Sequence, residues 1–296
     1  IDRVDTPFGR SDEELGGSAV YFSFAASRFT DVRMVGVVGQ DFPEHYEERL
    51  GRQPIDTEGL CRVPGRTFRW HGAYEGRMAQ AETRDVELNV FADFEPRIPE
   101  NYRDSRYVFL ANASPVTHLH ILEQMGAAVF SMADTMNFYI AHERDALLEL
   151  MGHIDALIIN DAEVLMLSGE PTLLAAADWV LERGPGHCII KKGEHGAMHC
   201  GPEGVFTLPA LPTQKVMDPT GAGDSFAGGF MGYVAREAAE GELTPQVFRR
   251  ALAYGTVTAS FALEHFGPWT FEEVDDKELD LRMEWFLDCT QIERTH

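Results

Sequence analysis

The 296-residue sequence has few cysteines and no long apolar run. Its four cysteines, Cys61, Cys188, Cys200 and Cys289, lie far apart, so none of them shows the short spacing of a zinc site or a redox motif. Scattered thiols of this kind are typical of reduced cysteines in a cytoplasmic protein. A run of about 18 apolar residues is absent, so the sequence predicts no membrane span.

Positive charge is scarce, because 25 Lys and Arg residues stand against 48 Asp and Glu and give a formal net charge of −23. Such a surface repels phosphate backbones and anionic lipid headgroups, which argues against nucleic acid or a membrane as a partner. The phosphate loop GxxxxGK[ST] is missing, and no GxGxxG follows an N-terminal strand, so a dinucleotide-binding fold is weakly supported. Hydrophobic residues make up 44% of the chain, enough for one large core or two modest ones.

Short apolar runs alternate with helix-like stretches along the chain. The runs that predict buried strands are 32–39, 107–111, 127–132, 156–160 and 188–191. The stretches that predict helices are 17–28, 143–151, 173–183, 223–239 and 245–264. Strands that alternate with helices pair in parallel and are covered on both faces, so we expect a three-layer α/β core.

The stretch 65–94 breaks this rhythm, because it is rich in Arg, Thr and aromatic residues and alternates in part. It predicts a few strands outside the main sheet, and such a small sheet can cover a cleft as a lid. We place this lid at about 65–95, together with part of 3–15; the alternative is an ordinary surface hairpin. Its polar and aromatic side chains either contact substrate or face solvent: Arg69, Trp70, His71 and Arg77.

The most informative segment is DPTGAGDSFAGGF, residues 218–230. Its GAG triplet, residues 221–223, can adopt backbone angles closed to larger residues, and the apolar stretch after Asp224 continues as a helix. The turn therefore presents free backbone N–H groups at a helix N-terminus, which is an anion-binding arrangement. Asp224 either caps this helix or, beside a bound anion, accepts a proton from an attacking hydroxyl.

This motif resembles the C-terminal signature of the ribokinase and phosphofructokinase-B-like carbohydrate kinases, a family that includes adenosine kinase. Further marks follow in the family's order: Gly16-Gly17, VGVVGQD at 35–41, NDAE at 160–163 and KGEHGA at 192–197. The resemblance covers nearly the whole chain. It implies one ribokinase-like kinase domain over residues 1–296, with a mostly parallel central sheet flanked by helices and a small β-sheet lid.

The resemblance also implies an activity, the ATP-dependent transfer of the γ-phosphoryl group to a hydroxyl of a sugar or sugar-like molecule. Asp224 is then the general base, and the backbone of Gly221, Ala222 and Gly223 is the anion hole. The positions that match nucleotide-binding residues of the family are Lys192, Gly193, Gly196 and Thr220. The positions that match substrate-binding residues are Asp2, Gly16, Gly17, Asp41 and Asn137, the last in a DxN element that begins at Asp134.

Asn160 and Glu163 match family residues that position Mg²⁺ through water; the alternative is a helix cap and its capping-box partner. The resemblance leaves K⁺ open as a monovalent cation at Asp218, because the loop 264–270 is unlike the family's usual cation loop. The family's first strand, just before Asp2, is missing from the sequence, so we expect residues preceding Ile1.

Two other functions stay open at this stage. A nucleoside kinase of the adenosine type fits a chain whose first helix carries Tyr21 where the family often has asparagine. A catalytically silent nucleotide or sugar sensor is the second, and the intact Asp224 argues against it. Lids often pair between subunits in the family, which would give a homodimer. The sequence does not identify the acceptor.

Overall fold

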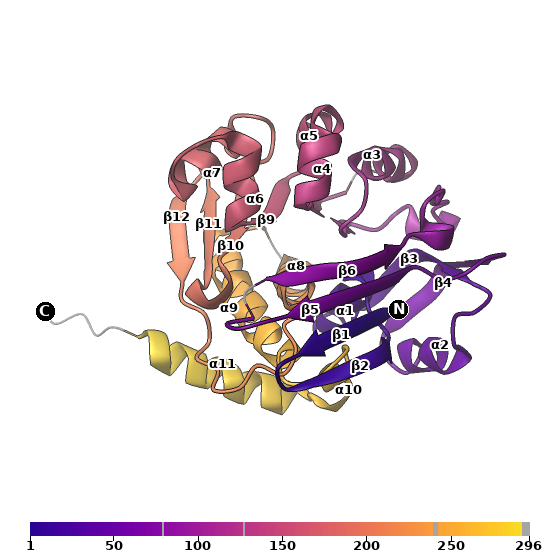
Figure 1. The fold of residues 1–296 in the computed structure, drawn as a ribbon. Coiled ribbons are helices and arrows are strands. Elements are labelled where there is room, and N and C mark those ends of the chain that lie inside the picture. The colour runs from indigo at the N-terminus through magenta and orange to yellow at the C-terminus, as the bar shows by residue number, and fades with distance from the viewer. Residues whose placement is uncertain (79, 127, 239–241, 292–296) are drawn as a thin grey trace, which may run out of the picture.

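A six-stranded sheet crosses the α/β core of the computed structural model, which describes residues 1–78, 80–126, 128–238 and 242–291 (Figure 1). Four of its strands are parallel: β7 (Tyr107–Leu110), β8 (Phe130–Asp134), β9 (Ala156–Asn160) and β10 (His187–Lys191). Two antiparallel strands complete the edge beside β10: β11 (Ala197–Gly201) and β12 (Gly204–Leu208). The expected mostly parallel sheet is therefore present.

Both faces of the central parallel strands β8, β9 and β10 are buried, which explains why these strands are apolar runs. In β9, Leu157 and Ile159 contribute to one core cluster, whereas Ala156 and Ile158 contribute to the other. The cluster with Leu157 is covered by α3 (Pro115–Gln124), α4 (Asn137–His142), α5 (Arg144–Met151), α6 (Asp161–Ser168) and α7 (Leu173–Leu181). These elements give two of the three expected layers.

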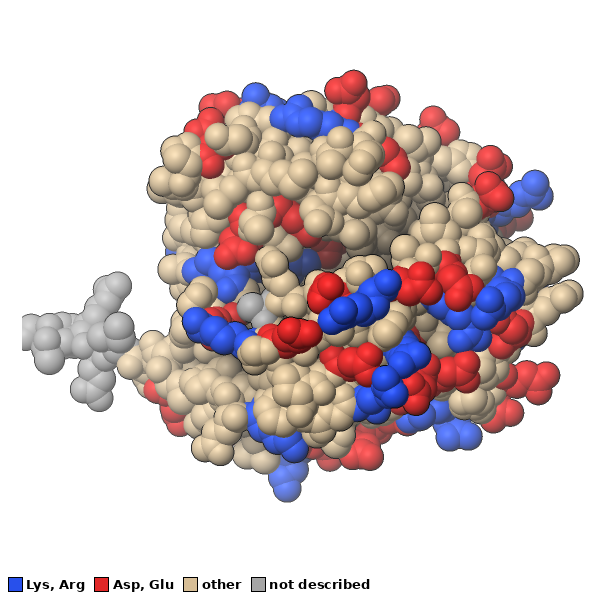
Figure 2. Space-filling view, in the orientation of Figure 1, with Lys and Arg blue, Asp and Glu red and all other residues tan. Residues whose placement is uncertain are grey.

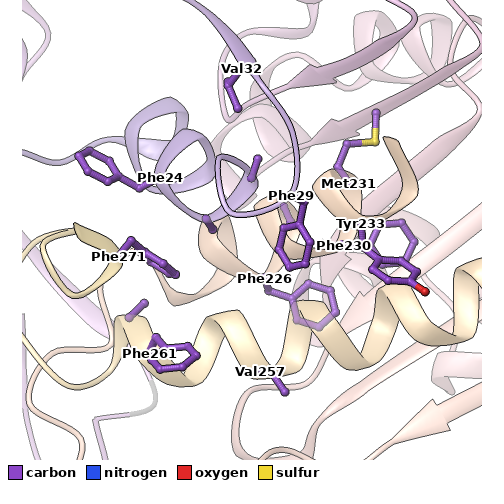
Figure 3. Packing of buried hydrophobic residues seen from close by; sticks show 14 of the residues in the cluster. Phe24, Phe29, Val32, Phe226, Phe230, Met231, Tyr233, Val257, Phe261 and Phe271 are labelled. Atoms are coloured by element: carbon purple, nitrogen blue, oxygen red, sulfur yellow. The ribbon is translucent and has the colours of Figure 1, made fainter. Parts of the chain in front are cut away.

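The third layer contains the aromatic part of the core, in which Phe226, Phe230, Phe261 and Phe271 are among the buried side chains between helices (Figure 3). Its helices are α1 (Ser18–Ala26), α8 (Ala222–Ala238), α9 (Pro245–Ala262), the short α10 (Thr270–Glu273) and α11 (Asp276–Thr290). Helices α1 and α8 approach closely, because a Cβ on Gly228 would lie 2.4 Å from the carbonyl oxygen of Phe22. Gly228 therefore lets α8 pack directly against α1, while the next residue, Gly229, faces Thr258 of α9.

A second, four-stranded sheet lies against the core in the order β2-β1-β5-β6 (Figure 1). Its strands are β1 (Asp2–Thr6), β2 (Gly9–Glu14), β5 (Arg69–Tyr74) and β6 (Ala81–Glu87). Strands β1 and β5 are parallel, and the two outer pairs are antiparallel. We call it the lid sheet. Beside it, β3 (Val32–Gly39) and β4 (Ile55–Val63) form a parallel pair connected through α2 (Glu44–Leu50).

Several elements were not expected from the sequence, namely β4, α2, α3, α4, α10, α11 and the β11–β12 hairpin. Ala79, Ala127, Ala239 and residues 292–296, which fall within the predicted lid, elements or domain, lie outside the described residues. One kinase domain with the lid as an insertion stays our interpretation. Among the described helices, none is by itself long and apolar enough to cross a membrane, and the bent pair α6–α7 satisfies that criterion by length and composition alone.

Candidate active site

The turn at residues 218–223 leads into α8 and leaves several amides without a partner. Ala222 N–H donates to the carbonyl oxygen of Pro219 at 3.2 Å, and Ser225 N–H donates to that of Gly221 at 2.8 Å. Within the described part of the chain, the N–H groups of Gly221, Gly223 and Asp224 have no hydrogen-bond acceptor. These three donors stand at the positive end of the helix dipole, so this turn suits an anion. Of the predicted anion hole, Gly221 and Gly223 keep amides without an acceptor, whereas the Ala222 amide is already bonded to Pro219.

Asp224 lies in the first turn of α8 with a strongly perturbed carboxyl group. Burial and the nearby carboxylate of Asp134 raise its pKa to about 7, whereas Lys191 and a hydrogen bond with Ser18 act in the opposite direction. A carboxyl group with a pKa near neutral pH can take up and release a proton, which a plain helix cap does not need.

Asp134 and Lys191 form an ion pair at the ends of β8 and β10. Lys191 Nζ donates to Asp134 Oδ2 at 2.7 Å, and Thr135 N–H donates to Asp134 Oδ1 at 2.8 Å. Asn137, three residues beyond Asp134, is exposed at the start of α4. The structure therefore brings Asp134 to the turn at 221–223 and leaves Asn137 at the rim.

The predicted substrate residues Asp2, Gly16 and Gly17 lie together on the lid side of the site. A Cβ on Gly16 would stand 1.8 Å from Asp2 Oδ2, so only glycine leaves room for this carboxylate. Asp2 is 4% exposed, and burial together with Asp218 raises its pKa to about 6, against a hydrogen bond from Gly17. A buried acid of this kind is suited to accept hydrogen bonds from substrate hydroxyls.

Tyr21 does not fit the idea that it stacks on a base. It is 2% exposed, and a Cβ on Gly221 would lie 2.2 Å from its ring. Burial raises the pKa of the Tyr21 phenol well above its ordinary value. The nearby carboxylates of Asp2, Asp218 and Asp224 raise it further. The Tyr21 ring therefore packs against the turn and has no exposed face on which a base could stack.

Asp218 and Thr220 connect the turn to the lid. Thr220 N–H donates to Asp218 Oδ1 at 2.8 Å, and Thr220 Oγ1 donates to Tyr74 Oη of β5 at 3.2 Å. Asp218 Oδ2 is buried and has no partner among the described residues. An orphaned carboxylate oxygen fits a cation ligand.

Asn160 and Glu163 form the capping box that was the alternative reading. Glu163 N–H donates to Asn160 Oδ1 at 2.8 Å, and Asn160 N–H donates to Glu163 Oε2 at 3.1 Å. Burial and Asp134 raise the pKa of Glu163 to about 7. In the described chain, no three His, Cys, Asp or Glu side chains cluster closely enough to hold a metal alone. The pair fits a water-mediated role through Glu163 Oε1, beside its capping role.

The predicted nucleotide residues Lys192, Gly193 and Gly196 form a tight turn after β10. Lys192 N–H donates to the carbonyl oxygen of Gly196 at 2.8 Å, and a Cβ on Gly196 would lie 2.0 Å from the Leu208 oxygen. The Glu194 carboxylate in this turn pairs with Arg77 in the β5–β6 connection. Gly193 and Glu194 of this turn are exposed, Gly196 is buried, and the turn contacts the β5–β6 connection through Glu194.

Asp41 anchors the base of the lid sheet instead of projecting freely. Its Oδ1 accepts from the N–H and the hydroxyl of Thr67, each at 2.7 Å, and its Oδ2 accepts from Arg69 at 3.4 Å. His71 Nε2 lies 2.7 Å from Asp5 Oδ2. The lid residues Arg69 and His71 are therefore paired within the protein. Figure 2 shows the surface hollowed between the lid sheet and the helices of the upper layer, with acidic and basic side chains on its border.

Comparison with known proteins decides the family. The profile described as pfkB family carbohydrate kinase matches residues 9–274. The chain belongs to this family. It is a kinase, an ATP-binding phosphotransferase with an alcohol group as acceptor, and its acceptors are of the nucleoside or sugar class.

Individual relatives agree with this assignment. The cytidine kinase of Thermococcus kodakarensis is 28% identical over 278 residues, which cover 91% of this chain and 95% of that protein. The nucleoside kinase of Burkholderia thailandensis in complex with inosine superposes with a TM-score of 0.78 at 20% identity, over 96% of this chain and 94% of that one. Thermotoga maritima ribokinase gives 0.74 at 21% identity, over 96% of each chain. The expected ribokinase-like fold is confirmed.

Sequence reasoning missed Lys191 and Tyr74, which adjoin the turn at 218–223 of this kinase through Gly223 and Thr220. Lys191 is the polar end of a run that predicts a strand, and its position at the carboxyl edge of a parallel sheet was the available signal. Tyr74, in the lid sheet, contacts Thr220, which lies 146 residues further along the sequence, and no local pattern predicts a contact of this kind.

Proposed function

We propose that the protein transfers the γ-phosphoryl group of ATP to a hydroxyl of a nucleoside, with Asp224 as the general base. The observation that carries this proposal is the Asp224 carboxyl group, with a pKa near 7, beside three amides that lack acceptors. Amides fixed around an anion favour phosphoryl transfer, and an adjacent carboxylate then has a hydroxyl proton to accept.

In the proposed reaction, the P–O bond to ADP breaks as the bond to the acceptor oxygen forms. The acceptor proton passes to Asp224, and the amides of Gly221, Gly223 and Asp224 hold the phosphoryl oxygens. Mg²⁺ bound with ATP supplies positive charge for the phosphates. Glu163 would bind water molecules of this ion through the carboxylate oxygen that the capping box leaves free. Asp2 holds the acceptor, and the turn 193–196 lies along the nucleotide.

A nucleoside is favoured over a free sugar because the relative with the broadest match described above is named a cytidine kinase. Other relatives include a nucleoside kinase of Methanocaldococcus jannaschii, 31% identical over 140 residues. A free sugar is the second candidate, supported by a similarity to Lactococcus lactis ribokinase, 26% identical over 238 residues.

A panel of acceptors tests this choice. Cytidine, uridine, adenosine, inosine, ribose and fructose are each incubated with ATP and Mg²⁺, and ADP formation is followed while the product is identified by mass spectrometry. We expect kcat/KM for one nucleoside to exceed that for either sugar by about 100-fold, since a site with buried polar groups discriminates strongly. Preference for a free sugar would contradict the nucleoside assignment and leave the kinase assignment intact.

The pH dependence follows from the state of Asp224. The base must be ionised, and its pKa is raised to about 7, so kcat/KM falls as the pH decreases through about 7 and drops roughly tenfold per pH unit below it. Asp2, with a pKa of about 6, adds to the loss at lower pH if its carboxylate holds the acceptor. Steady-state rates from about pH 5 to about pH 9 measure this. A profile that stays flat from about pH 5 to about pH 7 would rule out a base with this pKa.

We infer a K⁺ site at Asp218, supported by its buried oxygen without a partner. The kinase assay tests this site, because replacing K⁺ by Li⁺ should lower turnover.

A homodimer through the lid sheet is supported by two exposed apolar residues, Phe8 in the β1–β2 turn and Val86 in β6. Analytical ultracentrifugation of the protein and of Val86→Lys tests it, since a monomer in both would exclude the dimer. The cytoplasmic location stays a prediction from the scattered cysteines.

A further inference from the structure

Lys191 is a buried cation to which the mechanism above gives no role. Its side chain is 17% exposed and that of its partner Asp134 is 5% exposed. Removing an ion pair from water costs about as much free energy as the attraction returns, so stability alone is a weak reason for its presence. The pair stands where parallel strands end, which is the edge of an α/β sheet that binds ligands.

The Lys191 ammonium is adjacent to the turn at 221–223. A Cβ on Gly223 would lie 3.4 Å from Nζ, so the ammonium stands against the residue whose amide has no acceptor. An ammonium has three N–H donors, and the 2.7 Å bond to Asp134 uses one of them. Asp134 is itself fixed through Oδ1 by the Thr135 N–H. Donors of Lys191 therefore remain for a ligand at the turn.

Lys191 also balances the charge at this edge. Burial pushes its pKa down, but the carboxylates of Asp134, Asp224 and Glu163 raise it above its ordinary value, so it stays protonated. Without a cation among them, these three carboxylates would repel an incoming phosphate. The neighbouring Lys192 does not share this position, because its Nζ donates to Thr207 of β12 at 3.3 Å.

We propose that Lys191 is a further catalytic residue, whose ammonium, oriented by Asp134, donates a hydrogen bond to the terminal phosphoryl group at the turn. This proposal rests on the proposed function. Lys191 keeps its proton throughout, while the acceptor proton goes to Asp224, the γ-phosphoryl group passes from ATP to the acceptor oxygen, and ADP leaves. Asp134 is a positioning residue, since it acts through the ammonium.

The first test measures how much the terminal phosphate contributes to nucleotide affinity, apart from the rest of the nucleotide. Calorimetry measures the binding of ADP and of a methylene-bridged ATP analogue, both with Mg²⁺, to the wild type and to Lys191→Met. We expect the variant to lose about tenfold or more in affinity for the analogue and less than about threefold for ADP, since charge-assisted bonds are the strong ones. Lys191→Arg keeps the charge and should retain most of the preference for the analogue. Equal losses for both ligands would overturn the proposal.

The second test is turnover. We expect Lys191→Met to lower kcat about 100-fold or more with the acceptor KM changed less than about threefold, as for removal of one fixed donor. The matched control is Lys277→Met, an exposed lysine of α11, which should leave kcat unchanged. A kcat within about threefold of the wild type in Lys191→Met would overturn the proposal.

Asp134→Asn gives the positioning test. Alone it should lower kcat about tenfold. Added to Lys191→Met it should lower kcat almost no further, because both changes disrupt the same Lys191–Asp134 pair. Losses that multiply in the double variant would refute the positioning role. If the wild type phosphorylates no nucleoside or sugar, the proposed function fails; the comparison of the ATP analogue with ADP still decides whether Lys191 contacts the terminal phosphate.

Discussion

Asp224→Asn is expected to lower kcat by about 10² to 10⁴-fold, the contribution of a general base. The amide cannot accept the acceptor proton, but it has nearly the same shape, so substrate KM should change little. The folded protein should be as stable as the wild type or more so at neutral pH. The pKa of Asp224 is raised on folding, so the ionised carboxylate costs stability above its ordinary pKa, and the substitution removes that cost.

Steady-state kinetics and thermal unfolding of the same samples measure both effects. Asp276→Asn is the matched control, because Asp276 is also an acid in the first turn of a helix, α11, and is exposed. The control should keep full activity. Wild-type turnover in Asp224→Asn would disprove the base, and a large fall in Tm would indicate that Asp224 acts as a cap.

Gly221→Ala is expected to destabilise the protein and to abolish most turnover. Gly221 has φ +74°, where Ala costs about 1 kcal/mol. Its Cβ would also meet the buried Tyr21 ring at 2.2 Å, and overpacking of that kind adds about 1–3 kcal/mol. The turn has to move to relieve this contact. A displacement of about 1 Å at the phosphoryl site can cost about 100-fold in rate.

Gly169→Ala is a close control for this variant. Gly169 ends α6 with the same φ of +74°, and no atom lies within 4 Å of its added Cβ. It should therefore show the backbone cost alone, with full activity. Circular dichroism melts and kinetics of both variants compare them. Equal Tm and kcat values in the two would show that the contact with Tyr21 does not constrain the turn.

The parts of the fold that the sequence predicted are those with strong local periodicity. Strands 32–39 and 156–160 match β3 and β9 in both bounds, because they are short apolar runs between clear turn residues. Strand β4 was missed, because its alternating IDTEGLCRV carries charges on a partly exposed face. Helix α11 was missed too: it is amphipathic, but its polar residues outnumber the apolar ones that it buries.

The candidate site likewise has a part that the sequence predicted and a part that it did not. The turn at 221–223 and Asp224 are contiguous in the sequence, so a local motif could identify them. The contacts around them join residues far apart in the sequence. Lys191 and Asp134 are separated by 57 residues, and Tyr74 and Thr220 by 146. Contacts over such separations depend on strand order, which no single segment determines.

Strand β1 has a mechanical consequence for substrate selection. It begins at Asp2, the residue that we propose holds the acceptor, and continues into the lid sheet, where it pairs with β5, the strand that ends at Tyr74. In the proposed mechanism, one strand therefore both holds the acceptor and forms part of the lid sheet. On this proposal, a water molecule that enters alone would not engage Asp2 as an acceptor does, so we expect the same strand to disfavour ATP hydrolysis without an acceptor.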